Sequence, residues 1–149
     1  MSARETESAQ DTGSVTNTGS YPGSLSTSDT CHVILLAHGS SDPHWKETFE
    51  ALARPSCDAN PKAVVGYMEL CEPSLEQQIV RLKKEGANCI KVVPLFLARG
   101  RHLRKDVPEM LERYRKEHGI SLILTPPIGE HPALAQSIKA IVDDTLKAP

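Results

Sequence analysis

The sequence predicts an α/β domain built on a parallel sheet, because short β-branched runs alternate with helix-length amphipathic stretches. The alternation starts near Cys31 and continues to the C-terminus. The third apolar run, residues 89–97, is almost wholly apolar, which is typical of a central strand covered on both faces. Right-handed crossovers restrict the topology, and we expect a strand order of 2-1-3-4.

Composition divides the chain into two parts. Residues 1–30 are almost entirely small or polar, so we expect a disordered N-terminal tail there. Residues 31–149 are expected to form one domain. Of the 149 residues, 39% are hydrophobic and 24% are charged, which is a normal balance for a single soluble domain.

Charge and hydropathy exclude several classes of protein. A formal net charge of −2 argues against a general nucleic-acid binder, and no apolar run approaches the roughly 20 residues needed to span a bilayer. The polar, acidic N-terminus is unlike a signal peptide, so a cytoplasmic location is expected. The cysteines are too widely spaced for a zinc knuckle and are expected to be reduced thiols: Cys31, Cys57, Cys71 and Cys89.

The expected strands cover residues 33–37, 63–69, 89–97 and 121–125. The first helix is expected to open at Asp42 and to end at Pro55. The second is expected to run from Pro73 to Gly86. Their apolar faces are Trp45, Phe49 and Leu52 in the first helix, and Leu75, Ile79 and Leu82 in the second.

The last two helices also carry boundary signals. Asp106 and Glu109 have the spacing of a capping box, and Gly119 is expected to end the third helix. The final helix is expected to begin near Pro132. Its predicted core stripe consists of Leu134, Ile138, Ile141 and Leu146.

Metal-capable side chains lie at the carboxyl ends of three predicted strands or just beyond them: His38, Glu69 and His102. In an open parallel sheet, ligands bind outside the carboxyl ends of the strands, near the point where strand order reverses. We therefore expect these three side chains to form one metal site, of a kind that suits cobalt, iron, nickel or zinc. Taken singly, His38 is explained better by a hydrogen bond to a loop carbonyl, and Glu69 is explained equally well by solvent or a nearby arginine.

Basic residues surround His102, and Gly100 allows the chain to turn before it. Positive charge nearby favours the neutral imidazole and attracts a polyanionic ligand, although a basic run is most often a solvated loop. The cations are Arg99, Arg101, Arg104 and Lys105. A phosphate cradle at the loop after His38, which contains Ser40, is a weaker alternative because neither glycine-rich nucleotide motif is present.

Three further residues are candidates for the site or its rim, and a fourth is not. Cys71 lies two residues beyond Glu69, so it is the cysteine with a possible role. His44 and His131 are candidates for the rim, whereas His118 is expected to be a surface residue.

The segments LLAHGSSDP, YMELCEPSLEQQI, VVPLFLARGRHLRKDVPEML and PPIGEHP together resemble the short class II chelatases, which insert cobalt, iron or nickel into sirohydrochlorin. The most specific element is the string PLFL-x-x-G-x-H-x-x-x-D-x-P. The resemblance covers about residue 31 to the C-terminus.

This resemblance implies a flavodoxin-like, chelatase-like domain with helices on both faces of the sheet. It implies a lyase of siroheme or cobalamin-type biosynthesis that acts as a homodimer, takes Co²⁺, Fe²⁺ or Ni²⁺ as substrate and holds no permanent cofactor. His38 and His102 would bind metal or accept protons, with Glu69 as a third ligand. The tetrapyrrole carboxylates would be bound around Ser40, Arg99, Gly100, Arg101, Arg104 and Lys105. A carrier that binds metal or tetrapyrrole without inserting it, and a phosphate-binding domain of the same fold, are the alternatives.

Overall fold

The computed structural model describes residues 31–149, and the predicted tail lies outside the described residues. The described part of the chain forms a four-stranded parallel sheet in the order β2-β1-β3-β4, which confirms the predicted order. The strands are β1 (His32–Ala37), β2 (Ala63–Tyr67), β3 (Cys89–Pro94) and β4 (Ser121–Leu124). The helices are α1 (Pro43–Ala59), α2 (Leu75–Lys84), α3 (Val107–His118) and α4 (Pro132–Lys147), with a π-helix η1 (His102–Asp106) and a 3-10 turn η2 (Ile128–Glu130).

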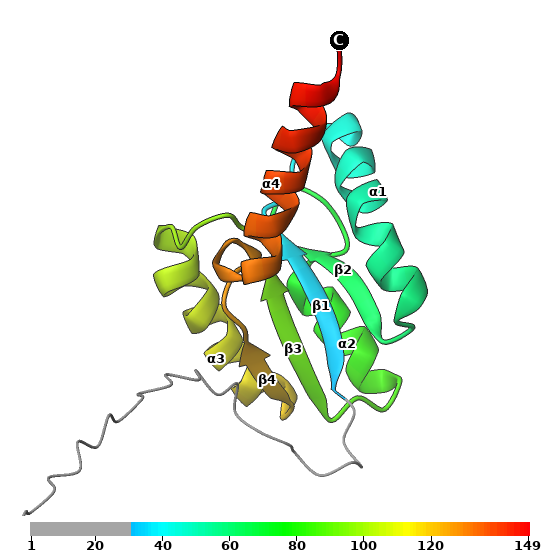
Figure 1. Ribbon diagram of the computed structural model, residues 1–149. Helices are drawn as coiled ribbons and strands as arrows, with labels where there is room; N and C mark the ends of the chain where they lie inside the picture. The colour runs from blue at the N-terminus through cyan, green and yellow to red at the C-terminus, as the bar shows by residue number, and fades with distance from the viewer. Residues whose placement is uncertain (1–30) are drawn as a thin grey trace, which may run out of the picture.

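The main core lies between the sheet and helices α2 and α3, which lie side by side on one face of it (Figure 1). Alternate residues of the strands point to this face, because successive side chains of a strand point to opposite sides. Those from the sheet are Ile34, Leu36, Ile90, Val92 and Leu122, and the predicted apolar face of α2 joins them through Leu75, Ile79 and Leu82.

Helix α1 covers the other face over β2 through an aromatic group. The ring centroids of Trp45 and Phe49 lie 6.2 and 5.8 Å from that of Tyr67. The Tyr67 hydroxyl donates to Glu50 at 3.2 Å, and burial together with this carboxylate raises the pKa of the phenol. Leu52, predicted on the same apolar face, is 75% exposed instead.

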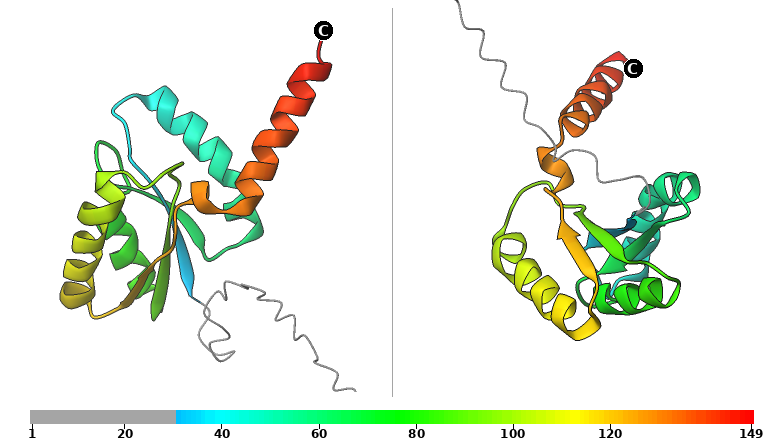
Figure 2. Two further views of the ribbon diagram at one scale, coloured as in Figure 1. Left: turned by 60° about the vertical axis from the view of Figure 1, so that its left-hand side comes forward. Right: turned by 90° about the horizontal axis from the view of Figure 1, so that it is seen from below.

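Helix α4 departs most from the sequence prediction. It projects beyond the carboxyl ends of the strands (Figures 1 and 2), and none of its residues is buried. The predicted core stripe is therefore wrong for this single chain: Ile138 is 51% exposed, Ile141 64% and Leu146 79%. An amphipathic pattern predicts that a helix has an apolar face, but not whether its own domain covers that face.

Several predicted helix boundaries are confirmed, although α2 begins at Leu75 with Ser74 as its cap and not at Pro73. The Asp42 side chain accepts the His44 amide at 2.9 Å and caps α1, while Ser74 caps α2 in a reciprocal capping box with Gln77. Pro55 does not end α1, which continues to Ala59. Pro55 has no amide hydrogen to donate to the carbonyl of Ala51. The helix tolerates this because Ala51 is exposed.

The start of the third helical segment differs from the prediction. Asp106 makes no capping hydrogen bond; instead, the chain is already helical from His102, in the π-helix that runs directly into α3. The amide of Val107 donates to the carbonyl of His102, which closes the wider turn. Gly119 ends α3 in the left-handed conformation, as predicted.

The prediction of four reduced cysteines is also wrong. Cys31 and Cys89 form a disulfide with Cα atoms 4.7 Å apart, whereas Cys57 and Cys71 are free. His32 pairs with Ile90 in the β1–β3 ladder, so the preceding positions face each other at the amino ends of two neighbouring strands. A spacing rule for zinc sites cannot detect this pair, because strand register creates it.

Among the described helices, none combines the length and apolar character needed to cross a membrane.

Candidate functional site

The structure brings the two predicted histidines together. His38 directly follows β1, and His102 begins η1 after β3. These two strands are parallel neighbours, so the segments that follow them lie side by side. The imidazole centroids are 5.5 Å apart, with the rings almost perpendicular at 80°. Both rings reach solvent, so an incoming ligand has access to them.

The two imidazoles line an open cavity of about 320 Å³. Its wall is mainly apolar: Leu95, Phe96, Leu97, Ala98, Gly100 and Leu103 complete the lining. The ring of Phe96 stacks on His38, with centroids 4.3 Å apart and planes 25° apart. The site therefore combines two nitrogen bases with an apolar surface suited to a flat ring system.

Asp106 fixes the orientation of His102. One of its carboxylate oxygens lies 2.7 Å from Nδ1 of His102, four residues earlier. An ionised carboxylate only accepts hydrogen bonds, so Nδ1 of the neutral ring carries the proton and Nε2 keeps its lone pair. Such an arrangement makes Nε2 a better metal ligand or proton acceptor. Asp106 therefore orients His102 and is not the predicted helix cap; its four-residue spacing from His102 is the sequence signal for this contact.

Glu69 is tied to the loop after His38 through the backbone. Its amide donates to the His38 carbonyl at 3.0 Å. Gly39 has a φ of +96°, and a Cβ atom there would lie 1.8 Å from the Glu69 carbonyl oxygen. The tight approach of these two strand-end loops thus requires glycine.

The carboxylate of Glu69 is exposed and does not form a compact ligand set with both imidazoles. Over residues 31–149, the one trio of ligand atoms from His, Cys, Asp or Glu found within 4.8 Å of one another belongs elsewhere, to Glu76, Glu117 and His118. The role of Glu69 as a third ligand stays a prediction.

The four cations of residues 99–105 are all exposed, and one of them, Arg99, has a carboxylate partner. Arg99 forms a two-bond ion pair with Glu130, with Nε–Oε1 at 2.6 Å and Nη2–Oε2 at 2.9 Å. This pair raises the pKa of Arg99 and lowers that of Glu130, chiefly through the hydrogen bonds. Arg101, Arg104 and Lys105 are exposed and belong to η1 or adjoin it.

Besides the Arg99–Glu130 pair, a backbone contact joins η2 to residues 96 and 97 of the cavity wall. The Gly129 amide donates to the Phe96 carbonyl at 3.1 Å. A Cβ atom at Gly129 would lie 1.6 Å from the Leu97 carbonyl oxygen, so the two backbones touch. Neither Gly129 nor Glu130 was predicted to have a role. Both residues belong to the segment PPIGEHP, but sequence alone does not show that this segment contacts residues 96 and 97.

The remaining candidates make other contacts. The Ser40 hydroxyl accepts the Asp42 amide at 3.1 Å, so it helps to shape the loop after β1. The Cys71 sulfur is 3.4 Å from the position that a Cβ on Gly39 would take. His131 caps α4 by accepting the Ala133 amide at 3.1 Å, and His44 is exposed at the start of α1.

Comparison with known proteins gives a consistent result. The family model described as CbiX matches residues 32–145. A sirohydrochlorin cobaltochelatase of Sulfurisphaera tokodaii is 29% identical over 119 residues, which cover 78% of this chain and 94% of the relative. One of Methanopyrus kandleri is 37% identical over 81 residues, which are 53% of this chain and 57% of that protein.

Solved structures include both single-domain and longer relatives. A cobalamin biosynthesis CbiX protein of Marinobacter aquaeolei is 51% identical with a TM-score of 0.76, and the match covers 79% of this chain and 98% of that one. The sirohydrochlorin chelatase SirB of Bacillus subtilis, in complex with cobalt, is 28% identical with a TM-score of 0.66. This match covers 77% of this chain but only 51% of SirB.

Proposed function

Because this chain belongs to the CbiX family and is a metal chelatase of the short class II form, we propose that it inserts a divalent metal into sirohydrochlorin. The product would serve siroheme or cobalamin-type biosynthesis, and the expected cytoplasmic location stays a prediction. The observation that carries the proposal is the pair of imidazoles, 5.5 Å apart, on an apolar-walled cavity at the carboxyl end of the sheet.

Metal insertion needs groups that accept protons and hold an incompletely coordinated ion. Two pyrrole N–H protons must leave the macrocycle as the metal enters. His102 suits the role of general base, since Asp106 orients its ring and leaves Nε2 free to accept a proton. His38 would share the metal ion with it, and its stacking on Phe96 holds that ring in place.

The surroundings of the two histidines suit a flat, polyanionic substrate. The macrocycle would lie against the apolar wall, where Leu97 is 72% exposed, and its carboxylates would meet Arg101, Arg104 and Lys105. Gly100, which lines the cavity, would give the substrate close access to the loop, and Ser40 would offer a hydroxyl from the loop after β1. Arg99 is already paired with Glu130, so we assign it to positioning the loop.

For the metal, we propose Co²⁺ as the substrate, with Fe²⁺ and Ni²⁺ as competing ions. The curated relatives are named cobaltochelatases, and SirB has been solved with cobalt and with Fe³⁺. Imidazole and carboxylate ligands accept all of these ions, and metal availability often decides among them.

We expect Glu69→Gln to weaken the apparent affinity for metal while leaving most of the maximal rate. The change keeps the size of the side chain but removes a charge that offsets the cation. Initial rates measured over a Co²⁺ series should show a raised half-saturating concentration and partial recovery at high metal. Glu72→Gln, also exposed and three residues away, is the matched control. Equal effects of the two changes would remove Glu69 from the site.

We also propose that the active form is a homodimer in which α4 packs on a second copy of this chain. SirB is about twice as long as the part that this chain matches, so one copy corresponds to half of that protein. The exposed apolar face of α4 supplies a surface for such pairing: Ile138, Ile141, Val142 and Leu146 are each at least half exposed. A two-fold axis would use this face twice.

We expect Ile141→Asp to dissociate the dimer. Burying one isoleucine contributes about 1.5–3 kcal/mol, and an unpaired carboxylate in its place is costly, with both effects doubled by the symmetry. Light scattering at assay concentration should give the mass of one chain for this variant and of two for the parent. Gln136→Asp, which adds the same charge to an exposed position of α4, should stay dimeric. A monomeric, fully active parent would overturn the proposal.

A further inference from the structure

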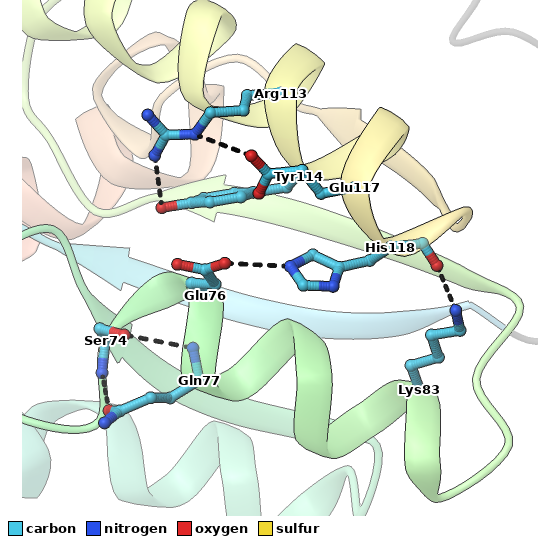
Figure 3. Close-up of polar contacts among 8 residues, drawn as sticks. All are labelled: Ser74, Glu76, Gln77, Lys83, Arg113, Tyr114, Glu117 and His118. Carbon is cyan, nitrogen blue, oxygen red and sulfur yellow. Dashed lines mark hydrogen bonds and ion pairs between the residues drawn. The ribbon is translucent and has the colours of Figure 1, made fainter.

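We propose that Glu76, Glu117 and His118 form a second divalent-metal site that links helices α2 and α3, separate from the cavity of His38 and His102. Their ligand atoms all lie within 4.8 Å of one another (Figure 3). His118 was expected to be a free surface residue, but only 22% of its side chain is exposed. This inference does not depend on the proposed function.

One pair of the three ligand atoms already lies near the spacing found around a bound ion, and all three lie within 4.8 Å of one another. Nε2 of His118 is 3.1 Å from a carboxylate oxygen of Glu76, which Figure 3 shows pointing at it. Without metal, Nε2 donates its proton to this carboxylate, so an ion binds as that proton leaves or moves to Nδ1. Metal bonds of about 2.0–2.2 Å in a tetrahedral site place ligand atoms about 3.3–3.6 Å apart. Small side-chain movements would therefore bring the three groups into coordination, with water completing the site.

Other contacts hold the backbone of α2 and α3 in place around these three residues. Lys83 donates to the His118 backbone carbonyl, and the Tyr114 ring lies beside the imidazole with centroids 6.1 Å apart. The capping box between Ser74 and Gln77 holds the first turn of α2, in which Glu76 lies. Ligands on anchored helices lose little freedom on binding.

One cation competes for this cluster. Arg113 lies 3.8 Å from Glu117, and its guanidinium also donates to the Tyr114 hydroxyl at 3.2 Å. The Arg113–Glu117 pair is exposed, and exposed ion pairs contribute little. A divalent ion, which would meet two carboxylates and one neutral imidazole, can displace this single charge.

The donor set also defines the class of ion. One imidazole nitrogen with two carboxylates suits Zn²⁺, Co²⁺ or Ni²⁺, whereas Mg²⁺ and Ca²⁺ prefer oxygen alone. Because the ligands come from two helices, a bound ion would cross-link α2 to α3 and stabilise the folded chain.

The test is a Zn²⁺ titration of the full chain in a His38→Ala/His102→Ala background, followed by calorimetry. We expect one remaining ion per chain, bound at least about tenfold more weakly after His118→Ala or Glu117→Gln. Glu112→Gln, on the same helix but paired with Arg115 and Lys116, should change nothing. Arg113→Gln should tighten binding.

A second readout is thermal unfolding. Zn²⁺ should raise the melting temperature of the background variant and fail to raise it once His118→Ala is added. Absence of a remaining ion, or equal loss in the Glu112→Gln and His118→Ala variants, would overturn the second site. Since neither measurement uses turnover, failure of the proposed metal insertion would leave this result interpretable.

Discussion

Replacing His102 with alanine is expected to lower the rate of metal insertion by about 10²- to 10⁴-fold, the usual effect of losing a positioned general base. His102 has the largest expected effect because it combines a free Nε2, an orienting carboxylate 2.7 Å from Nδ1 and a place on the cavity wall. His38→Ala should rank second. Steady-state rates with sirohydrochlorin and Co²⁺, followed by absorbance, measure both.

Two further variants separate chemistry from structure. Asp106→Asn should lower the rate less than His102→Ala, since an amide no longer enforces the proton on Nδ1 but the imidazole remains. His44→Ala, which removes an exposed imidazole at the start of α1, should be neutral. If His102→Ala retained near-normal turnover, or Arg101→Ala proved worse than both histidine changes, the loop would be mainly a docking surface for carboxylates.

The largest expected effect on stability belongs to Gly39→Ala. The residue has a φ of +96°, and the new Cβ would lie 1.8 Å from the Glu69 carbonyl oxygen. Strain at such a φ costs about 1–2 kcal/mol, and the clash with backbone adds to it because no side chain can move aside. We expect a loss of about 3 kcal/mol or more in the free energy of unfolding, measured by urea denaturation.

Gly86→Ala is the matched control for that change. Gly86 has the same φ of +96°, but a Cβ there would meet nothing within 4 Å. It should cost only the conformational strain, about 1–2 kcal/mol. The difference between the two variants measures the close approach of the loops after β1 and β2. Equal losses would show that this approach contributes little to stability.

Local patterns predicted the sheet well because each strand is a short apolar run bounded by turn residues. The same reasoning placed His38 and His102 together, since parallel neighbouring strands end at one edge. It also predicted the end of α3 at Gly119 and the buried face of α2, because caps and helical periodicity are encoded within a few residues.

Two failures share another cause: they depend on contacts between segments far apart in sequence. The Cys31–Cys89 disulfide follows from strand register, and the contact of His118 with Glu76 follows from the packing of α3 beside α2. The Asp106 failure is local. The sequence allows this carboxylate either to cap α3 or to contact His102 four residues earlier, and the structure shows the contact.

The exposed stripe of α4 has a different origin. Its periodicity shows correctly that the helix has an apolar face, but a single chain does not cover that face. The proposed second copy would resolve the difference without any change in the sequence interpretation.

The most direct test of the central claim is multiple-turnover metallation of sirohydrochlorin by the full chain with excess Co²⁺. We predict many equivalents of metallated product per chain, at a rate well above the uncatalysed reaction and largely lost in His102→Ala. Product formation that stops at one equivalent per chain, or that proceeds equally in the His102→Ala variant, would contradict the account and identify a carrier rather than a chelatase.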